Sequence, residues 1–356
     1  MYDLIAILPS SLPYRLPFYR ALACLHRIKI VVGNEIGAFD GFSIDYQELD
    51  ADIEMTNVYD FGFLGLKWQS GVLREFFRSG RSAFFIQGNI RFINFWIVIL
   101  FNSFLRKRLF VHGQGLYRFD NPGLFRRIVY SCMVIFSAYY VCYNDFVRKD
   151  FQRKMLFGKI FGGKLKVVDN LILGDANVLP RPSLGRDILF IGRVREGSSV
   201  LDFCRSLDAS SLDLRLYVVG ECSVDFTDYK KTKFMGPIFD STLLSEIASN
   251  CCFGIYPGDS GLSVLHYVRL GLVPVFHSSL SKHMGPEPAY FRGSDNRFRA
   301  CLTFTRGNFD EAISVLKKYS NDDISLQFLR DEVHDFSLSL SRLSPVDQFS
   351  GLIHAD

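Results

Sequence analysis

Short apolar runs alternate with longer helical stretches along almost the whole chain, and this alternation constrains the fold more than any other feature. The apolar runs predict strands at residues 3–8, 28–32, 83–87, 109–112, 138–143, 187–191, 214–219, 233–235, 253–256, 273–276 and 300–303. Helices are predicted at residues 14–25, 90–105, 122–136, 145–157, 200–207, 241–248, 262–270 and 310–319. Strands that are apolar on both faces and alternate with helices indicate parallel sheets covered by helices on both sides.

Length and turn-forming residues divide this pattern into two α/β domains. A chain of 356 residues is longer than a single hydrophobic core usually supports. Turn formers, among them Asn170, Gly174, Pro180 and Gly185, concentrate between residues 168 and 186. We therefore expect one doubly wound domain at residues 1–172, a second at residues 173–335, and a tail at residues 336–356.

Charge is divided unequally between the two halves of the chain. Residues 61–170 hold 18 Lys and Arg against 5 Asp and Glu, whereas residues 171–356 hold 19 against 23. Basic and aromatic side chains are interleaved at residues 74–78, 106–110 and 125–127, which favours an anionic membrane surface or a lipid diphosphate. Solvated basic helix faces are the alternative. Nucleic acid is not expected, because no RNP-like motif, helix-turn-helix cue or metal finger accompanies the charge.

Neither a membrane span nor a disulfide framework is predicted. The longest apolar stretch, residues 92–105, has about 14 residues, fewer than the roughly 20 that span a bilayer. The first nine residues lack a basic region and predict a buried strand rather than a signal peptide. The eight Cys are scattered without a CxxC spacing. We expect a cytoplasmic protein that associates peripherally with the inner face of the cell membrane.

The segment from Tyr256 to Val275 combines a strand, a Gly-rich turn and the start of a helix. Its turn reads Pro-Gly-Asp-Ser-Gly-Leu-Ser at residues 257–263. Such turns present backbone N–H groups to phosphate, so a nucleotide-linked ligand is the first expectation. The alternative is an ordinary strand-to-helix connection that needs Gly258 and Gly261 only for its turn geometry.

An ordered set of segments resembles the C-terminal donor domain of retaining glycosyltransferase family 4. In chain order these segments are residues 188–193 (ILFIGR), 216–221 (LYVVGE), 234–238 (FMGPI) and 256–275. Residues 9–19, 85–89 and 110–117 are similar to that family's opening loop and later N-domain strands. The resemblance implies a GT-B fold, in which two Rossmann-like doubly wound domains face each other across a cleft and the tail packs back on the N-terminal domain. The C-terminal domain would hold a nucleotide sugar and the N-terminal domain the acceptor.

The same resemblance places donor-binding residues at the strand ends of the second domain. Arg193, after Gly192, would bind the donor diphosphate without a metal, and Arg195 would replace the Lys that the family usually adds. The other donor-binding residues implied in this way are Gly220, Glu221, Gly236, Pro237, Ile238, Gly258, Asp259, Ser260, Gly261, Leu262, Ser263, His266 and Glu287. The alternative for residues 220–221 and 236–238 is that they form ordinary turns with no role in binding.

The Gly-rich turn departs from the family pattern at two positions. Many members carry two Glu residues with seven residues between them, and here Gly258 and His266 stand at the matching positions. Asp259, one place along, would partly replace the first carboxylate. The chain resembles instead a subset of the family from polysaccharide gene sets, which lacks the paired Glu. In that subset a downstream Pro-Glu, here Pro286-Glu287, implies that Glu287 binds a ribose or sugar hydroxyl.

His112 closes a predicted strand and precedes Gly113, which places it at the carboxyl end of the first sheet. The resemblance implies a catalytic role beside the transferred sugar, since a neutral imidazole can hydrogen-bond a hydroxyl or accept its proton. A structural His beneath a Gly-rich loop is the alternative. The acceptor-binding residues implied by the resemblance are Tyr14, Arg15 and Gln114. No metal site is predicted, because neither a carboxylate nor a Cys completes a ligand spacing with His266, His277 and His283.

Together these expectations describe a glycosyltransferase of bacterial lipopolysaccharide or capsule synthesis. It would move a sugar from a nucleotide-sugar donor, UDP-linked first and GDP-linked second, to a saccharide on polyprenyl diphosphate, without a cofactor and with retention. Two alternatives stay open: another nucleotide-sugar enzyme such as a GT-B epimerase, or a noncatalytic GT-B-like scaffold, which the missing Glu pair permits. A dinucleotide-dependent oxidoreductase would need G-x-G-x-x-G after the first strand, which residues 8–13 lack.

Overall fold

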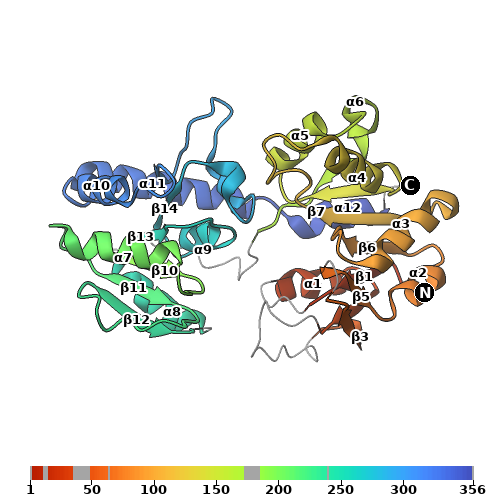
Figure 1. Cartoon of the computed structure of the whole chain (residues 1–356), viewed down its shortest axis with the longest axis horizontal. Coiled ribbons are helices and arrows are strands. Elements are labelled where there is room, and N and C mark those ends of the chain that lie inside the picture. The colour runs from red at the N-terminus through yellow and green to blue at the C-terminus, as the bar shows by residue number, and fades with distance from the viewer. Residues whose placement is uncertain are drawn as a thin grey trace. The chain divides into compact units, whose positions relative to one another are not determined.

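The chain divides into two compact units, each built around its own parallel sheet. The computed structural model describes residues 2–10, 15–34, 49–62, 65–171, 185–238 and 240–354. Unit 1 comprises Met1–Gly174 and Ser344–Asp356, and unit 2 comprises Asp175–Leu343 (Figure 1). The boundary expected at residues 335/336 falls inside one continuous helix, α11 (Asp323–Ser341), so the division by contacts lies after Leu343.

Unit 1 contains a sheet of seven parallel strands in the order β3-β2-β1-β6-β7-β8-β9. Its strands are β1 (Leu4–Leu8), β2 (Ile28–Gly33), β3 (Asp52–Thr56), β6 (Ala83–Gln87), β7 (Leu109–Gly113), β8 (Tyr139–Cys142) and β9 (Leu165–Val167), and a separate antiparallel pair is formed by β4 (Val58–Asp60) and β5 (Lys67–Gln69). The helices are α1 (Leu16–Ala23), α2 (Val72–Arg78), α3 (Ile93–Leu105), α4 (Leu124–Ile135), α5 (Asp145–Lys154), α6 (Gly158–Phe161) and α12 (Pro345–His354).

The strands of unit 1 are buried on both faces, as their apolar runs predict. Successive residues of β1 point to opposite sides, so Ile5 and Ile7 join one core cluster while Leu4, Ala6 and Leu8 join another. Helices α2, α3, α4 and α5 cover the first cluster, and α1 and α12 cover the second. The β1 and β6 strands mark the point where the strand order reverses, as in a doubly wound fold.

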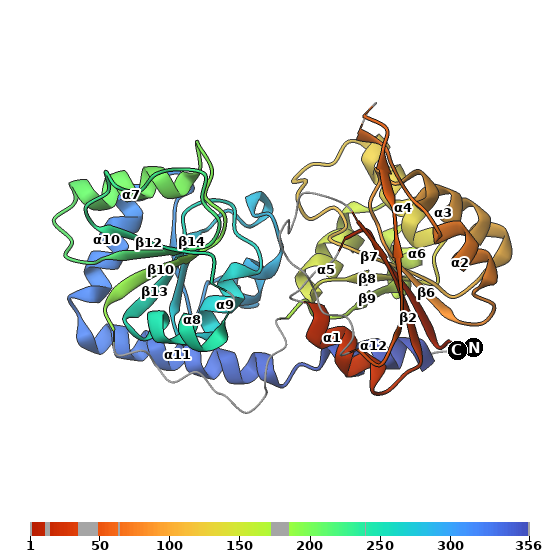
Figure 2. The ribbon, with the colours of Figure 1, turned by 90° about the horizontal axis from the view of Figure 1, so that it is seen from below.

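Helix α12 completes the core of unit 1, although it comes from the end of the chain. It packs beside α1 (Figure 2). The Phe349 ring makes edge contacts with the rings of Phe18 and Phe85 at 5.9 and 5.0 Å. The Gln348 side chain accepts a hydrogen bond from the Asp169 backbone N–H and donates one to the Asp169 carboxylate.

Unit 2 contains six parallel strands in the order β12-β11-β10-β13-β14-β15, which is the 3-2-1-4-5-6 order of a Rossmann-like sheet. They are β10 (Asp187–Ile191), β11 (Leu216–Val219), β12 (Thr232–Gly236), β13 (Cys251–Tyr256), β14 (Val273–His277) and β15 (Leu302–Phe304). The helices are α7 (Ser199–Ala209), α8 (Ser241–Ser249), α9 (Ser263–Arg269), α10 (Phe309–Ser320) and α11. Asp240, Asn308 and Asp322 cap α8, α10 and α11 with side-chain oxygens.

The structure adds several elements that the sequence analysis did not predict. They are mostly short or polar edge elements: β3, β4, β5, β9, α2 and α6. Within the described ranges, no helix is both long and apolar enough to cross a bilayer.

Candidate functional site

The carboxyl edge of the unit 2 sheet brings the loops after β10 and β13 together. These two strands are hydrogen-bonded neighbours, but the chain leaves β10 toward β11 on one side and reaches β14 from β13 on the other. Loops that diverge in this way open a crevice at the strand ends, which is where open α/β sheets bind ligands. Arg193 follows β10, and the Gly-rich turn follows β13.

Three glycines allow the loops after β10, β11 and β12 to approach one another at backbone distance. Gly220 has φ of 140°, and a Cβ atom on it would lie 2.0 Å from the Gly192 carbonyl oxygen. The Gly220 N–H donates to the Gly236 carbonyl at 2.9 Å, immediately before Pro237 and Ile238. The predicted nucleotide-lining segments are thus in mutual contact at one edge of the sheet.

An open hollow lies beside these loops. It is lined by Arg193, Val194, Arg195, Glu196, Glu221, Cys222 and Ser223. Backbone hydrogen bonds join its two sides, since the Val194 N–H donates to the Glu221 carbonyl at 2.9 Å and the Ser223 N–H to the Val194 carbonyl at 3.2 Å. Both predicted diphosphate-binding arginines therefore border one hollow.

Tyr256 connects the loop after β10 with the turn after β13. A Cβ atom on Gly192 would lie 3.3 Å from the Tyr256 ring. Burial raises the pKa of the Tyr256 phenol, while the Arg193 cation acts to lower it and the Asp259 carboxylate to raise it. Arg193 and Asp259 are thus both close enough to Tyr256 to act on it electrostatically.

The Gly-rich turn is held by His283, which the sequence analysis considered only as a metal ligand. The Ser260 backbone N–H donates to His283 Nδ1 at 3.0 Å, and the Ser260 hydroxyl lies 2.9 Å from the same nitrogen. The Ser260 carbonyl accepts from the N–H groups of Met284 and Gly285 at 2.8 and 3.2 Å. Ser260 is completely buried, so its main chain is fixed on both sides. Its N–H and hydroxyl are engaged by His283 and do not point to a ligand in the way that the sequence predicted for this turn.

The tautomer of His283 follows from these bonds. Because Nδ1 accepts from an N–H group, the ring proton is on Nε2, which donates to the His277 carbonyl at 2.9 Å. The His283 ring stacks on the His277 ring with centroids 3.8 Å apart. Burial and then the neighbouring His277 lower the pKa of His283 to about 3, which keeps the ring neutral. Both nitrogens are used within the protein, an arrangement that leaves no lone pair for a metal.

Asp259 links this histidine pair to a distant arginine. Arg306 Nε and Nη2 donate to the two Asp259 carboxylate oxygens at 2.8 and 3.0 Å, and His277 Nε2 lies 3.1 Å from one of them. Burial acts to raise the pKa of Asp259, but the hydrogen bonds from Arg306 and His277 outweigh it and lower that pKa. The structure therefore assigns this carboxylate a bracing role in the turn, which the resemblance did not include.

Glu287, which begins the 3-10 segment Glu287–Phe291, also belongs to this cluster. Its side chain is buried, and Oε2 would lie 2.0 Å from a Cβ atom on Gly285 and 3.7 Å from one on Gly261. His266 lies on α9, three residues after Ser263, and burial lowers its pKa to about 4, with Arg269 adding to the effect. The turn therefore has one carboxylate from Glu287 and a neutral imidazole from His266 near it. Leu262 and Ser263 form the start of α9.

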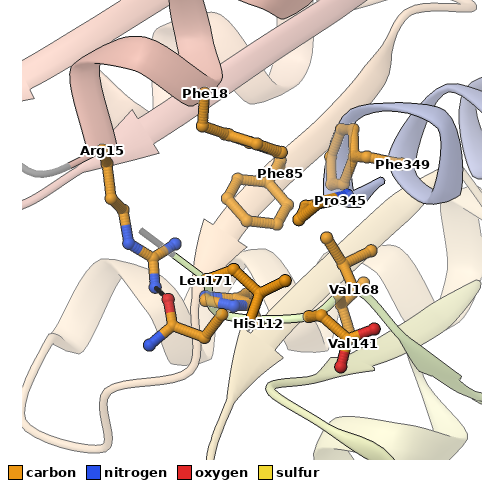
Figure 3. A pocket seen from close by; sticks show the side chains of 11 residues that line it. Arg15, Phe18, Phe85, His112, Val141, Val168, Leu171, Pro345 and Phe349 are labelled. Atoms are coloured by element: carbon orange, nitrogen blue, oxygen red, sulfur yellow. Dashed lines mark hydrogen bonds between the residues drawn. The ribbon is translucent and has the colours of Figure 1, made fainter. Parts of the chain in front are cut away.

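In unit 1, His112 lies at the carboxyl end of β7 and lines a pocket (Figure 3). Its ring is 5% exposed and stacks on the Tyr143 ring at 4.5 Å, with the Phe85 ring 5.3 Å away. Burial lowers the pKa of His112 well below its ordinary value, and the Arg15 cation adds to this. His112 is therefore neutral near pH 7 and can donate or accept one hydrogen bond.

Arg15 and Asp169 give the same pocket one positively and one negatively charged side chain. The Arg15 guanidinium lies over the Tyr143 ring at 5.6 Å, and Nη2 donates to the Asn170 side-chain oxygen at 3.0 Å. The pocket is closed by Phe18, Phe85, Val141, Val168, Asp169, Leu171, Pro345 and Phe349. A cation and an imidazole at the rim of an apolar pocket can bind a polar group attached to an apolar one.

Two other predicted acceptor residues are not placed in this pocket. Gln114 follows β7 and is half-buried, and its carbonyl accepts from the Tyr117 N–H at 3.2 Å. It does not line the pocket that contains His112. Tyr14 lies outside the described residues. In the part of the chain that the structure describes, no group of three His, Cys, Asp or Glu side chains is arranged to hold a metal ion.

Sequence reasoning missed the residues that brace the site. His283 and Arg306 fix the turn of unit 2, while Tyr143, Asn170 and Phe349 shape the pocket of unit 1. The one sequence signal for any of them was that His277 and His283 follow a strand at the same sheet edge as the Gly-rich turn. The other four come from segments that sequence spacing does not connect.

Solved structures share this architecture over the whole chain. HepE of Anabaena, in complex with UDP and glucose, matches with a TM-score of 0.65 at 12% identity over 98% of both chains. A glycosyltransferase from Rickettsia africae matches with a TM-score of 0.64 at 14% identity over 99% of both chains. The lipopolysaccharide outer core galactosyltransferase WaaB, in its apo form, gives 0.59 at 11% identity over 98% of this chain and 99% of its own.

These likenesses establish the fold. The prediction of a GT-B fold built from two Rossmann-like units is confirmed. No protein-family model matches the chain. No curated protein matches its sequence.

Proposed function

We propose that the protein is a glycosyltransferase that takes a sugar from a nucleotide-sugar donor bound by unit 2. The observation that carries this proposal is the convergence of Arg193, the three close-packed glycine loops and the braced Gly-rich turn at the reversal point of the second sheet. Glycines permit close approach of a ligand to the backbone, and fixed cations with oriented N–H groups neutralise a pyrophosphate leaving group. We infer a UDP-linked donor first and a GDP-linked donor second, since HepE is solved with UDP.

The proposed chemistry relies on charge and position. Arg193, with Arg195 on the same hollow, stabilises the diphosphate as the bond to the sugar breaks. Glu287 and His266 bind hydroxyl groups of the ribose or the sugar. His112 binds the transferred sugar or accepts the proton of the attacking hydroxyl, a role for which its neutral imidazole is suited. We infer a retaining reaction that needs no metal.

For the acceptor, we propose a saccharide on a polyprenyl diphosphate, in bacterial lipopolysaccharide or capsule synthesis. The pocket of unit 1 supports an acceptor that is partly apolar, because Arg15 and His112 meet a wall of Phe18, Phe85 and Phe349 there. The excess of 18 basic over 5 acidic residues between positions 61 and 170 supports an anionic lipid partner. WaaB, one of the similar structures, is itself a lipopolysaccharide galactosyltransferase.

Calorimetry followed by turnover tests the donor proposal. The purified protein is titrated with UDP, GDP, dTDP and ADP, and the corresponding nucleotide sugars are then assayed for nucleotide release with and without a lipid-extract acceptor. We expect one nucleotide to bind and its sugar conjugate to be turned over faster with the acceptor. Binding without any turnover favours the noncatalytic scaffold. The absence of both binding and turnover for all four nucleotides contradicts the proposal.

A further inference from the structure

Helix α3 is apolar around its whole circumference, yet one of its sides faces solvent. Its sequence, INFWIVILFNSFL, has no charged residue. Phe95, Val98 and Ile99 are buried in the core of unit 1, as expected. Leu100 and Phe104, on the other side, are 60% and 78% exposed. A helix that is hydrophobic all round is normally buried in protein or membrane, so the exposed side requires an explanation.

The exposed apolar surface continues from α3 onto the neighbouring helices. We call it the outer face of unit 1, and its large exposed apolar residues are Phe77, Leu100, Phe101, Phe104, Leu105, Leu124, Phe125, Ile128, Phe136, Phe157 and Ile160. Phe125, Phe157 and Ile160 are 77%, 63% and 73% exposed. Single exposed apolar residues are ordinary, but a concentration of this kind marks an interaction surface.

Contacts between the helices make the outer face continuous. The Phe77 ring of α2 lies 5.2 Å from the Phe101 ring of α3. The Asn102 side chain of α3 donates to the Phe136 carbonyl at the end of α4 at 2.8 Å. The Ser131 hydroxyl of α4 accepts from the Leu156 N–H, just before α6, at 2.9 Å. Helices α2, α3 and α4 lie along the same side of the sheet (Figure 2).

Basic residues predominate on the outer face, and Asp120 is the one acidic residue among positions 76–144. Exposed basic side chains lie on these helices or close to them in sequence, at Arg78, Arg81, Arg91, Arg106, Arg126 and Lys159. The nearby carboxylates are neutralised inside the unit, since Glu75 pairs with Lys29 and Arg74, Asp145 with Arg148 and Lys149, and Asp150 with Arg153 and Lys154.

We propose that the outer face of unit 1 binds to the interfacial region of an anionic lipid bilayer. Its aromatic rings would insert among the acyl chains and its basic groups would contact the lipid phosphates. Charge selects this occupant over a second copy of the chain, because pairing two such faces would bring like charges together. The proposal deepens the inferred lipid-linked acceptor, but the surface argument does not depend on the donor chemistry of unit 2. Without a spanning helix among the described residues, binding is peripheral and reversible.

Vesicle flotation tests the proposal. The full chain is mixed with phosphatidylcholine vesicles with or without about one third phosphatidylglycerol, at low salt and at about 0.5 M salt. We expect binding to the anionic vesicles that falls at least tenfold without the anionic lipid or at high salt. The proposal is overturned if the wild-type protein does not bind anionic vesicles at low salt, or if it binds both lipid compositions equally.

Matched variants locate the contact. Phe104→Ser with Phe125→Ser removes two rings that are mostly solvent-exposed, so folding is retained, and we expect vesicle binding to fall about tenfold or more. Ile324→Ser with Phe328→Ser on α11 of unit 2 is the control, because those side chains are 84% and 66% exposed. Equal loss in both variants, or no loss in the first, contradicts the assignment.

Two further measurements separate this inference from its rivals. Sedimentation of the wild type and of the Phe104/Phe125 variant without lipid tests for a dimer, and a dimer that the variant abolishes assigns the face to a second copy and overturns the proposal. Nucleotide binding by the same variant reports on unit 2 and is expected to be unchanged. A variant that no longer binds vesicles but still binds the nucleotide supports the membrane role of the outer face, whatever acceptor the enzyme uses.

Discussion

The two sheets have the same kind of strand order, but the candidate binding groups at their carboxyl ends are of different kinds. In unit 1 the chemical groups are side chains, His112 and Arg15, set into a pocket with aromatic walls. In unit 2 the expected contacts come largely from the main chain of glycine loops, and the side chains of His283, Asp259 and Arg306 hold that main chain in place. The comparison teaches that substitutions in unit 1 should act directly on binding, whereas many in unit 2 should act through loop geometry.

Arg193→Ala is expected to have the largest effect, because Arg193 directly follows Gly192 at the end of β10 and is, with Arg195, assigned to the leaving group. Removing one fixed donor to a developing charge costs about 100-fold to 1,000-fold in kcat. Steady-state nucleotide release measures the loss. Arg205→Ala, which removes an exposed arginine paired with Asp202 on α7, is the control and should leave kcat unchanged. Equal rates for wild type and Arg193→Ala would remove the direct role.

His112→Ala tests the side-chain site of unit 1 and should lower kcat by about 100-fold, as for the loss of a general base or sugar contact. The affinity for free UDP, measured by calorimetry, should not change, because the nucleotide is proposed to bind to unit 2. Since the pKa of His112 is well below its ordinary value, the ring stays neutral from pH 6 to 8. The ratio of wild-type to variant rates should therefore be constant over that range. A ratio that falls steeply toward pH 6 would show that the ring titrates there.

The partly exposed but desolvated His266 of unit 2 should make the stability of that unit fall in acid. His266, with a pKa lowered to about 4, is neutral when folded but takes up a proton when unfolded below its ordinary pKa. Stability is therefore fully present above about pH 6.5 and declines as the pH falls, by about 2 kcal/mol at pH 5 for this one group. Urea unfolding of wild type and His266→Gln at pH 7.5 and 5 measures the difference.

The smallest effect is expected from the brace of the Gly-rich turn. His283→Ala removes the acceptor of the Ser260 N–H and should weaken nucleotide binding about tenfold, the cost of one lost hydrogen bond with a buried donor left unpaired. Ser260→Ala keeps the backbone bond and loses only the hydroxyl, so its dissociation constant should change less. If Ser260→Ala proves the more damaging, the contact between the Ser260 hydroxyl and His283 holds the turn more than the backbone hydrogen bond does.

The sequence predicted those parts of the fold that local pattern determines. The central strands are continuous apolar runs, so β1, β6, β10 and β14 were found within a residue or two. The edge strands of unit 2, β12 and β15, were predicted, but those of unit 1 were missed, because β3 (DIEMT) carries charged residues and β9 (LKV) is only three residues long. Such strands are defined by pairing with a neighbour rather than by their own composition.

The candidate site residues also divide into those that the local sequence predicted and those that it did not. Gly192 and Arg193 follow β10 in the sheet of unit 2, and His112 lies near the end of β7 in the sheet of unit 1. Each parallel sheet gathers the ends of its own strands at one edge, so these positions could be predicted. The hydrogen bond between Arg15 and Asn170 joins residues 155 positions apart, and the one between Asp259 and Arg306 spans 47. No periodicity in the sequence encodes contacts of that kind, so the braces became visible only in three dimensions.

The crossing of the chain at Leu343 has a consequence for synthesis. Phe349 and Ile353 belong to the core of unit 1, but they are translated after the whole of unit 2. While they are still inside the ribosome, unit 1 has an uncovered apolar surface beside α1 and an incomplete wall around His112. The first unit to be made is therefore the last to be finished, and a chain cut after residue 343 should leave it open to chaperones and proteases.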